Sequence, residues 1–199
     1  MKRIILCCLF FLSSIALATI SVGADRGGLN GWSVRKNWQF GCQPTDFSQS
    51  LDKKWVFVLG DDSKVHILTI DGEEKGRIPV AEGTLALDIE ARGEMLYLMD
   101  KNGMYTAISI SLAENNFEWS IQKTWKTTGK PLSFAHSKKK SIVFVLEEDN
   151  AVHAYSFSGN PLGDIPVDPG TIAIDVIPRK NMLYLMSEDK TYTALNIFF

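Results

Sequence analysis

Short apolar runs alternate with turn residues along most of the chain. Residues 56–59 (VFVL) and 95–99 (MLYLM) are continuous apolar runs, and Gly, Asp, Asn or Ser interrupts the chain on either side of them. Runs of β-branched and aromatic residues bounded in this way are typical of short strands joined by tight turns. No window carries a convincing helical period. The pattern therefore predicts an all-β meander.

The same pattern occurs twice. Residues 56–59 return as residues 143–146, 87 positions later, and residues 32–112 align with residues 119–199 without a gap, with 34 identities in 81 positions. Inside one copy, residues 56–59 also match residues 96–99, 40 positions on. A four-strand unit of this length that occurs four times is typical of β-propeller blades.

We therefore expect an all-β, four-bladed β-propeller made of two tandem copies of a two-blade unit. The predicted blades cover residues 44–80, 85–125, 131–167 and 172–199, and the last has only three strands of its own. Residues 32–40 match residues 119–127, which follow the third strand of the second blade. This N-terminal strand is expected to pair with the last blade and close the ring, which would remove the free edges.

The N-terminus has the pattern of a signal peptide. Lys2 and Arg3 precede an apolar stretch over residues 4–17, and small residues at 22–24 precede Asp25. We predict a signal peptide at 1–24, a flexible leader at 25–31, and a propeller domain at 32–199 with repeat units 32–112 and 119–199. The chain is therefore expected to be exported, and the resemblance described below implies the periplasm or cell envelope of a bacterium. No transmembrane segment is expected after cleavage, although an uncleaved anchor is the alternative.

Charge and cysteine content narrow the choice of function. Lys and Arg number 21 against 23 Asp and Glu, giving a net charge of −2, and removal of the leader makes the chain more acidic. This balance argues against a general nucleic-acid binder. Cys42 is the one cysteine outside the leader, so no intramolecular disulfide is expected. Cys42 is either a small core residue or a free reactive thiol.

The motifs of the blades resemble a known class of repeats. Residues 54–65 (KWVFVLGDDSKV), with 78–80 (IPV) and 95–98 (MLYL), are similar to the YVTN and NHL propeller repeats of exported bacterial proteins. They resemble in particular the segment that precedes DsbA-like thiol-disulfide oxidoreductase domains. The resemblance implies an extracytoplasmic sensing or docking module. No Cys-x-x-Cys motif follows, so no redox role passes to any residue here.

Residues that could carry chemistry are few. No common nucleophile, metal or phosphate-binding motif occurs in the mature chain, and His66 and His153 are repeat equivalents, for which we expect packing or hydrogen bonding. Asp88 and Asp175 lie in otherwise apolar first strands, which line the channel of a propeller. Two carboxylates there predict an axial cation site, with Ca²⁺ as the candidate, or else hydrogen bonds to backbone N–H groups.

Turns between second and third strands are acidic in all four blades, and they must share one face. This predicted acidic binding face comprises Asp61, Asp62, Asp100, Glu147, Glu148, Asp149, Glu188 and Asp189. The turns of the opposite face are mostly basic. The alternative is that these are ordinary solvated hairpin turns.

The sequence thus favours a non-catalytic binding or scaffold module that contacts a protein or small ligand through its face loops. It leaves open an accessory role in a thiol-disulfide redox system through Cys42, or an enzyme that uses the axial carboxylates. Apart from Ca²⁺ no cofactor is expected. A monomer is favoured, with a homodimer that joins the blades of two chains into a larger ring as the alternative.

Overall fold

The computed structural model describes residues 39–50, 52, 54–90, 94–113, 116–137, 140–177 and 181–198. All its regular elements are β-strands. No helix in this described part has the length and apolar character needed to cross a membrane. The predicted signal peptide, the leader and residues 32–38 of the predicted N-terminal strand lie outside the described residues.

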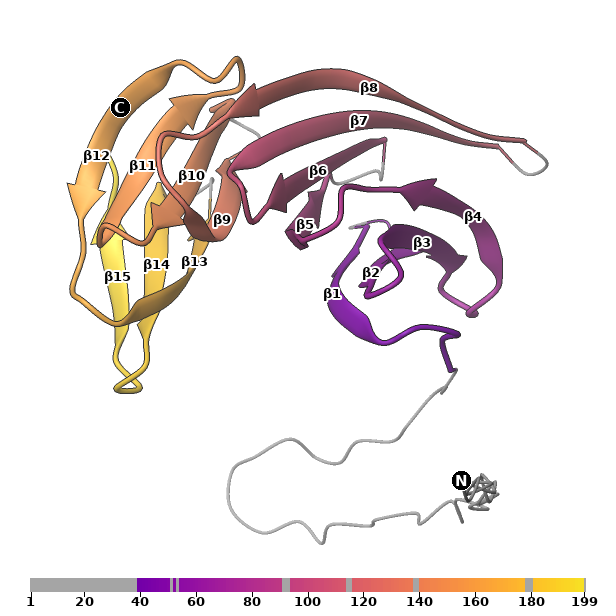
Figure 1. The fold of residues 1–199 in the computed structure, drawn as a ribbon, viewed down its shortest axis with the longest axis horizontal. Coiled ribbons are helices and arrows are strands. Elements are labelled where there is room, and N and C mark those ends of the chain that lie inside the picture. Colours follow the sequence, from indigo (N-terminus) through magenta and orange to yellow (C-terminus); the bar gives the residue numbers. More distant parts are fainter. Residues whose placement is uncertain are drawn as a thin grey trace, which may run out of the picture. The chain divides into compact units, whose positions relative to one another are not determined.

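In the part of the chain that the structure describes, fifteen strands form four antiparallel sheets, each built from consecutive strands (Figure 1). Blade 1 contains β1 (Pro44–Gln49), β2 (Trp55–Gly60), β3 (Lys64–Thr69) and β4 (Glu74–Pro79). Blade 2 contains β5 (Thr84–Ile89), β6 (Met95–Asp100), β7 (Met104–Ala113) and β8 (Asn116–Lys126). Blade 3 contains β9 (Pro131–Ser137), β10 (Ile142–Glu147), β11 (Ala151–Ser156) and β12 (Pro161–Pro166). Blade 4 contains β13 (Thr171–Ile177), β14 (Met182–Ser187) and β15 (Tyr192–Asn196).

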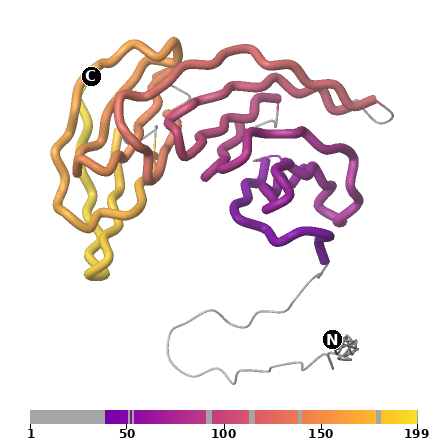
Figure 2. Tube along the Cα trace, viewed as in Figure 1, coloured from indigo at the N-terminus to yellow at the C-terminus, as the bar shows by residue number. Residues whose placement is uncertain are grey.

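The blades follow one another in chain order (Figure 2). Their first strands pack in sequence, with β5 against β1, β9 against β5, and β13 against β9. This arrangement confirms the prediction of an all-β chain with four blades arranged as a β-propeller.

Three buried clusters join the blades. One joins blades 1 and 2 and includes Phe57 and Leu96, one joins blades 2 and 3 around Tyr105, and one joins blades 3 and 4 around Phe144 and Leu183. Because side chains alternate between the faces of a strand, a blade between two neighbours buries both faces of its middle strands. All six residues of β10 are buried accordingly, whereas β14 of the terminal blade alternates between buried and more exposed positions.

Hydrogen bonds also join neighbouring first strands. Oδ2 of Asp46 in β1 accepts the backbone N–H of Leu87 in β5 at 2.7 Å, and Oγ of Ser133 in β9 accepts that of Ile174 in β13 at 3.3 Å. Asp46 and Ser133 occupy the same repeat position. Burial raises the pKa of the Asp46 carboxyl, and the backbone hydrogen bonds from Leu87 and Phe47 act in the opposite direction.

The third strand of blade 4 has no strand neighbour on its outer side among the described residues. Its counterpart β7 pairs there with β8. Ring closure by residues 32–40 stays a prediction, because residues 32–38 lie outside the described part of the chain.

Replacement of Asp46 tests the link between blades 1 and 2. Because its folded-state pKa is raised, Asp46 favours folding most at a pH below its ordinary value of 3.8, and this contribution is lost as pH rises through the folded-state pKa. In Asp46→Ser the hydroxyl keeps an acceptor for Leu87, as Ser133 does for Ile174. We expect the variant to lose this fall in the free energy of unfolding, measured by urea titration at a series of pH values from about 3 to 6. An unchanged pH slope would contradict the assignment.

Candidate functional site

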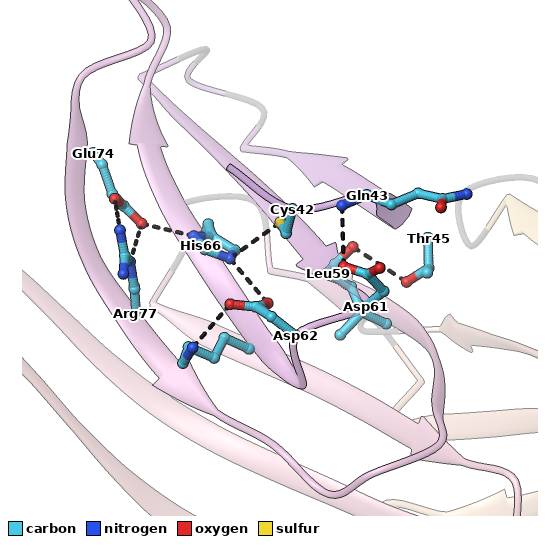
Figure 3. A network of polar contacts seen from close by, with 10 residues as sticks. Cys42, Gln43, Thr45, Leu59, Asp61, Asp62, His66, Glu74 and Arg77 are labelled. Carbon is cyan, nitrogen blue, oxygen red and sulfur yellow. Dashed lines mark hydrogen bonds and ion pairs between the residues drawn. The ribbon is translucent and has the colours of Figure 1, made fainter. Parts of the chain in front are cut away.

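A cluster of Cys42, Asp62 and His66 lies beside the β2–β3 hairpin (Figure 3). His66 is in β3, Asp62 is in the turn before it, and Cys42 precedes β1. His66 Nε2 lies 3.4 Å from the Cys42 Sγ and 3.2 Å from Asp62 Oδ1. One potential ligand atom from each of the three residues lies within 4.8 Å of the others.

The local fold holds Cys42 against this hairpin. The backbone N–H of Gln43 donates to Asp61 Oδ1 at 3.0 Å, and the backbone N–H of Asp61 donates to the carbonyl of Gln43 at 3.0 Å (Figure 3). The Thr45 hydroxyl donates to the carbonyl of Leu59 at 3.2 Å. The segment that carries Cys42 is therefore fixed to the turn that carries Asp62.

The other nitrogen of His66 faces a carboxylate. Nδ1 lies 2.7 Å from Glu74 Oε1, and Arg77 donates to both oxygens of Glu74 at 2.6 Å (Figure 3). Hydrogen bonding by Arg77 is the main cause that lowers the pKa of Glu74 to about 2. His66 thus has one ring nitrogen at Glu74 and the other at Cys42 and Asp62, and the tautomer decides which nitrogen donates to a carboxylate.

The carboxylates around Cys42 favour its thiol form over the thiolate. Burial raises the pKa of Cys42, and the negative charges of Asp62, Asp61 and Glu74 raise it further. A reactive cysteine needs the opposite setting, with nearby cations that favour the thiolate.

Blade 3 carries a second cluster at the same place, formed by Glu147, Asp149 and His153. His153 Nε2 lies 2.9 Å from Asp149 Oδ2 and 3.6 Å from Glu147 Oε2. Its Nδ1 lies 2.7 Å from Asp164 Oδ1. Burial opposes protonation of His153, but hydrogen bonds to Asp149 and Asp164 outweigh it, so the pKa of His153 is raised.

Glu147 in this second cluster has almost no contact with solvent. Its side chain is 1% exposed, and the Tyr155 hydroxyl donates to Oε1 at 3.2 Å. The other carboxylate oxygen, Oε2, faces His153. A buried carboxylate needs such partners, because an unpaired charge away from water is costly.

The two clusters keep two positions and exchange the third. Asp62 and His66 match Asp149 and His153 at the 87-residue spacing, whereas Cys42 matches Gly129 and Glu147 matches Gly60. A Cβ added to Gly60 would lie 2.6 Å from Cys42 Sγ, and one added to Gly129 would overlap the Glu147 carboxylate. The same space is thus filled by Cys42, from the segment before β1, in one copy and by Glu147, from the end of β10, in the other, and the glycine opposite leaves room for it.

Cys42, Asp62, Glu147 and Asp149 are separate candidates in the sequence, and nothing predicted there groups them with a histidine. The missed signal is Asp-x-x-x-His across a tight turn, at residues 62–66 and again at 149–153. In a hairpin the turn residue folds back over the strand that follows it, so these side chains meet.

Six residues of the predicted acidic binding face are exposed: Asp61, Asp62, Glu148, Asp149, Glu188 and Asp189. Asp100 and Glu147 are buried instead, which corrects the expectation for these two. Asp100 Oδ1 accepts the backbone N–H groups of Asn102 and Met104 at 2.8 and 2.9 Å and so shapes the β6–β7 turn. The basic turns expected on the opposite face lie partly outside the described residues.

The predicted axial aspartates both bond to adjacent backbone. Oδ1 of Asp88 accepts the N–H of Ile89, and Oδ1 of Asp175 accepts that of Val176, each at 2.7 Å. Strand β9 packs against both β5 and β13 and so stands between the strands that carry them. These contacts are those of the hydrogen-bonding alternative, and the Ca²⁺ site stays a prediction.

The outer faces of the terminal blades repeat the two sides of a buried junction. Blades 2 and 3 meet through Tyr97, Met99 and Tyr105 on one side, and through Phe134, Val143, Val145 and Tyr155 on the other. Their counterparts 87 positions away are Tyr184, Met186 and Tyr192, here named the blade 4 end face, and Phe47, Val56, Val58 and Leu68, here named the blade 1 end face.

Exposure differs sharply between counterparts. Tyr105 is 0% exposed and Tyr192 is 62% exposed, while Phe134 is 8% exposed and Phe47 is 71% exposed. Val56, Val58 and Leu68 form a small buried cluster against which Phe40 packs. Phe47 in the blade 1 end face, and Met186 and Tyr192 in the blade 4 end face, are therefore exposed although their repeat counterparts are buried.

A scan against protein-family models and a search of curated proteins gave no match. Solved structures do match. The β-propeller domain of Myceliophteria thermophila Cps50 (Swd1) aligns with a TM-score of 0.66 at 10% identity, covering 78% of this chain and 51% of that chain. The RRP9 WD40 repeats align with a TM-score of 0.64 at 13% identity, covering 80% and 50%. The structure of U3-55K aligns with a TM-score of 0.59 at 11% identity, covering 79% and 53%.

At these identities the likeness concerns the fold. The chain spans about half the length of the structures it matches. Similarity to structures described as a β-propeller domain and as WD40 repeats agrees with the four observed blades, and the chain has the β-propeller fold.

Proposed function

We propose that the chain is a non-catalytic binding and scaffold module that joins propeller blades through its two end faces, with a second copy of itself as the partner. The observation that carries the proposal is the exposure of Phe47 and Tyr192, whose repeat counterparts Phe134 and Tyr105 are buried against each other's blades. Burial of an exposed aromatic side chain is worth about 1.5–3 kcal/mol, so both faces favour a partner.

The partner's shape follows from the duplication. Blade 2 packs on blade 3. At the 87-residue spacing of the repeat, blade 1 is the counterpart of blade 3, and blade 4 is the counterpart of blade 2. Blade 4 of one copy can therefore pack on blade 1 of another as blade 2 packs on blade 3. Two such junctions join two chains into a closed ring of eight blades, within the range known for propellers.

The likeness to solved propellers supports the same geometry. The four blades of this chain superpose on about half of each longer chain. The arrangement of one blade relative to the next is therefore similar to that in propellers of longer chains. A ring with more blades than the chain contains needs a second set.

Phe40 takes a defined place in this assembly. Its repeat counterpart is Thr127, whose backbone N–H donates to the carbonyl of Gly103 at 2.9 Å and extends the β7–β8 pairing of blade 2. Gly103 corresponds to Lys190. In the pair, Phe40 would leave the blade 1 end face and its backbone would bind Lys190 of the second copy, opening that face to Tyr184 and Tyr192.

Sedimentation equilibrium of the mature chain tests the proposal. We expect twice the mass of one chain, and a monomer for Phe47→Lys and for Tyr192→Glu, because each places a charge in the apolar junction. Tyr105 and Phe134 face each other with ring centroids 6.5 Å apart, so Tyr192 and Phe47 of two copies should meet in the same way.

Mixing the two variants provides the specific control. A Tyr192→Glu chain and a Phe47→Lys chain form one junction with opposite charges and one wild-type junction, so the mixture should regain the dimer mass. Leu162→Lys, at an exposed apolar residue of β12, should remain dimeric. A monomeric wild type, or a dimer that persists in both single variants, would overturn the proposal. A monomer would favour closure by the chain's own N-terminal strand.

The exposed acidic turns support a second candidate function, the binding of a cationic protein surface. Asp61, Glu148, Glu188 and Asp189 stand on equivalent turns of three blades, which a ring directs to one side. Only part of this charge is offset nearby, since Lys130 pairs with Glu148 and Lys64 with Asp62. Complementary charge increases the association rate and makes it depend on salt.

Binding to a defined basic protein such as cytochrome c measures this tendency. We expect surface plasmon resonance to show association that slows as salt rises, and that slows about tenfold in a variant with Asp61→Asn, Glu148→Gln, Glu188→Gln and Asp189→Asn. A variant with Glu73→Gln and Glu118→Gln, whose residues lie away from these turns, should bind like wild type. Salt-independent binding, or an equal loss in both variants, would count against the acidic face.

We also propose that the protein acts in the periplasm or cell envelope of a bacterium. The predicted signal peptide at 1–24 and the resemblance to YVTN and NHL repeats support export to a bacterial periplasm or envelope. The mass of the mature protein recovered from cells measures this directly, since cleavage should leave Asp25 as the first residue.

A further inference from the structure

The two histidine clusters have the ligand set and spacing of zinc sites. We propose that each repeat binds one Zn²⁺, the first through Cys42, Asp62 and His66 and the second through Glu147, Asp149 and His153. Zinc accepts thiolate, imidazole and carboxylate ligands, and three protein ligands with one open position are a common arrangement. The inference does not depend on the proposed assembly.

The distances in the first cluster fit a tetrahedral ion. With zinc bonds of about 2.3 Å to sulfur and about 2.0–2.1 Å to nitrogen or oxygen, tetrahedral angles separate S and N by about 3.6 Å and N and O by about 3.4 Å. Here Cys42 Sγ and His66 Nε2 are 3.4 Å apart, and His66 Nε2 and Asp62 Oδ1 are 3.2 Å apart. These two distances match a tetrahedral ion to within a few tenths of an ångström, and the third, between Cys42 Sγ and an Asp62 carboxylate oxygen, is within 4.8 Å.

Spacing in the second cluster is similar. His153 Nε2 lies 2.9 Å from Asp149 Oδ2 and 3.6 Å from Glu147 Oε2, which brackets the same tetrahedral edge. Glu147 is buried and its other oxygen is held by Tyr155, so one carboxylate oxygen is fixed toward the histidine.

Each histidine is also oriented as zinc ligands usually are. A metal-bound imidazole normally donates its other N–H to a carboxylate or carbonyl, which fixes the ring and its tautomer. His66 Nδ1 meets Glu74 and His153 Nδ1 meets Asp164, both at 2.7 Å. Glu74 and Asp164 are not repeat equivalents, since Asp164 matches Arg77. The orienting carboxylate is thus present in both copies although different positions supply it.

The charge balance is the same in both sites. Coordination converts the Cys42 thiol to a thiolate and releases one proton, so Cys42 and Asp62 supply two negative charges. Glu147 and Asp149 also supply two. Each set neutralises one Zn²⁺ beside a neutral histidine. Ca²⁺ prefers six to eight oxygen ligands, so the cysteine and histidine favour zinc.

Titration of Zn²⁺ into the chelator-treated full chain, with the heat measured by isothermal titration calorimetry, tests the proposal. We expect two Zn²⁺ per chain in wild type, one in His66→Ala and one in His153→Ala, and none in the double variant. Ca²⁺ in excess should leave the zinc heats unchanged. Glu74→Gln should keep the first site but weaken it by about tenfold to a hundredfold, because only the orienting contact is altered.

Cobalt distinguishes the two sites spectroscopically. Co²⁺ should give a thiolate-to-metal charge-transfer band in wild type and in His153→Ala, and the band should be absent in Cys42→Ser. Cys42→Ser is nearly isosteric, so its circular dichroism and melting temperature should match those of metal-free wild type. This variant keeps the test valid if a histidine variant fails to fold.

A variant that gives the first cluster the third ligand of the second cluster is the most specific test. Cys42→Gly combined with Gly60→Glu gives the first site the ligand set of the second. Removal of the cysteine clears the Sγ atom that a Cβ on Gly60 would meet at 2.6 Å, and the Asp62 carboxylate, also 2.6 Å from that Cβ, has to rotate aside. This double variant should bind two Zn²⁺ without the charge-transfer band. A Glu188→Gln and Asp189→Asn variant, outside both clusters, should also bind two. No zinc binding by wild type, or a stoichiometry unchanged by the His66 and His153 variants, would overturn the proposal.

Discussion

The need to cover both faces of every sheet governs this molecule. Each blade is a twisted antiparallel sheet whose middle strands carry apolar side chains on both sides, as in β2, β6 and β10. Such a strand is most stable when both of its faces are covered, because apolar surface left in water forgoes about 25 cal/mol for each square ångström. Among the described residues, the series of four blades satisfies this at three junctions and leaves one face without a neighbouring blade at each end.

Duplication determines what those end faces look like. The copied unit contains two blades, so the junction between the copies, blade 2 on blade 3, holds the same pair of surfaces that appears at the two ends. Tyr192 is the repeat counterpart of Tyr105, which is fully buried in the blade 2–blade 3 junction, but Tyr192 is 62% exposed. A repeat that creates complementary ends favours head-to-tail contacts, which close into a ring when the rotation permits.

Polar chemistry is confined to the same place in each copy. The hairpin between the second and third strands returns an aspartate to a histidine four residues later, and a third group arrives from the neighbouring strand end. Cys42 opposite Gly60 and Glu147 opposite Gly129 show that space, rather than residue identity, constrains the third position. Two solutions to one geometry within one chain indicate that the His–carboxylate arrangement itself is what the fold accommodates.

The sequence alone determined the strands, the blade boundaries and the four-fold repeat. Alternation and turn residues depend only on neighbouring residues, and the 87-residue period is found by comparing the chain with itself. The sequence marked Cys42, Asp62, Glu147 and Asp149 as candidates. The sequence also predicted that Asp100 and Glu147 lie on the acidic surface, and for these two residues the prediction was wrong. Burial of a turn carboxylate depends on the backbone N–H groups and hydroxyls that surround it in the folded chain. Only the tertiary structure brought His66 and His153 to their partners and showed which faces stay exposed, because those distances depend on strand register and on how neighbouring blades pack.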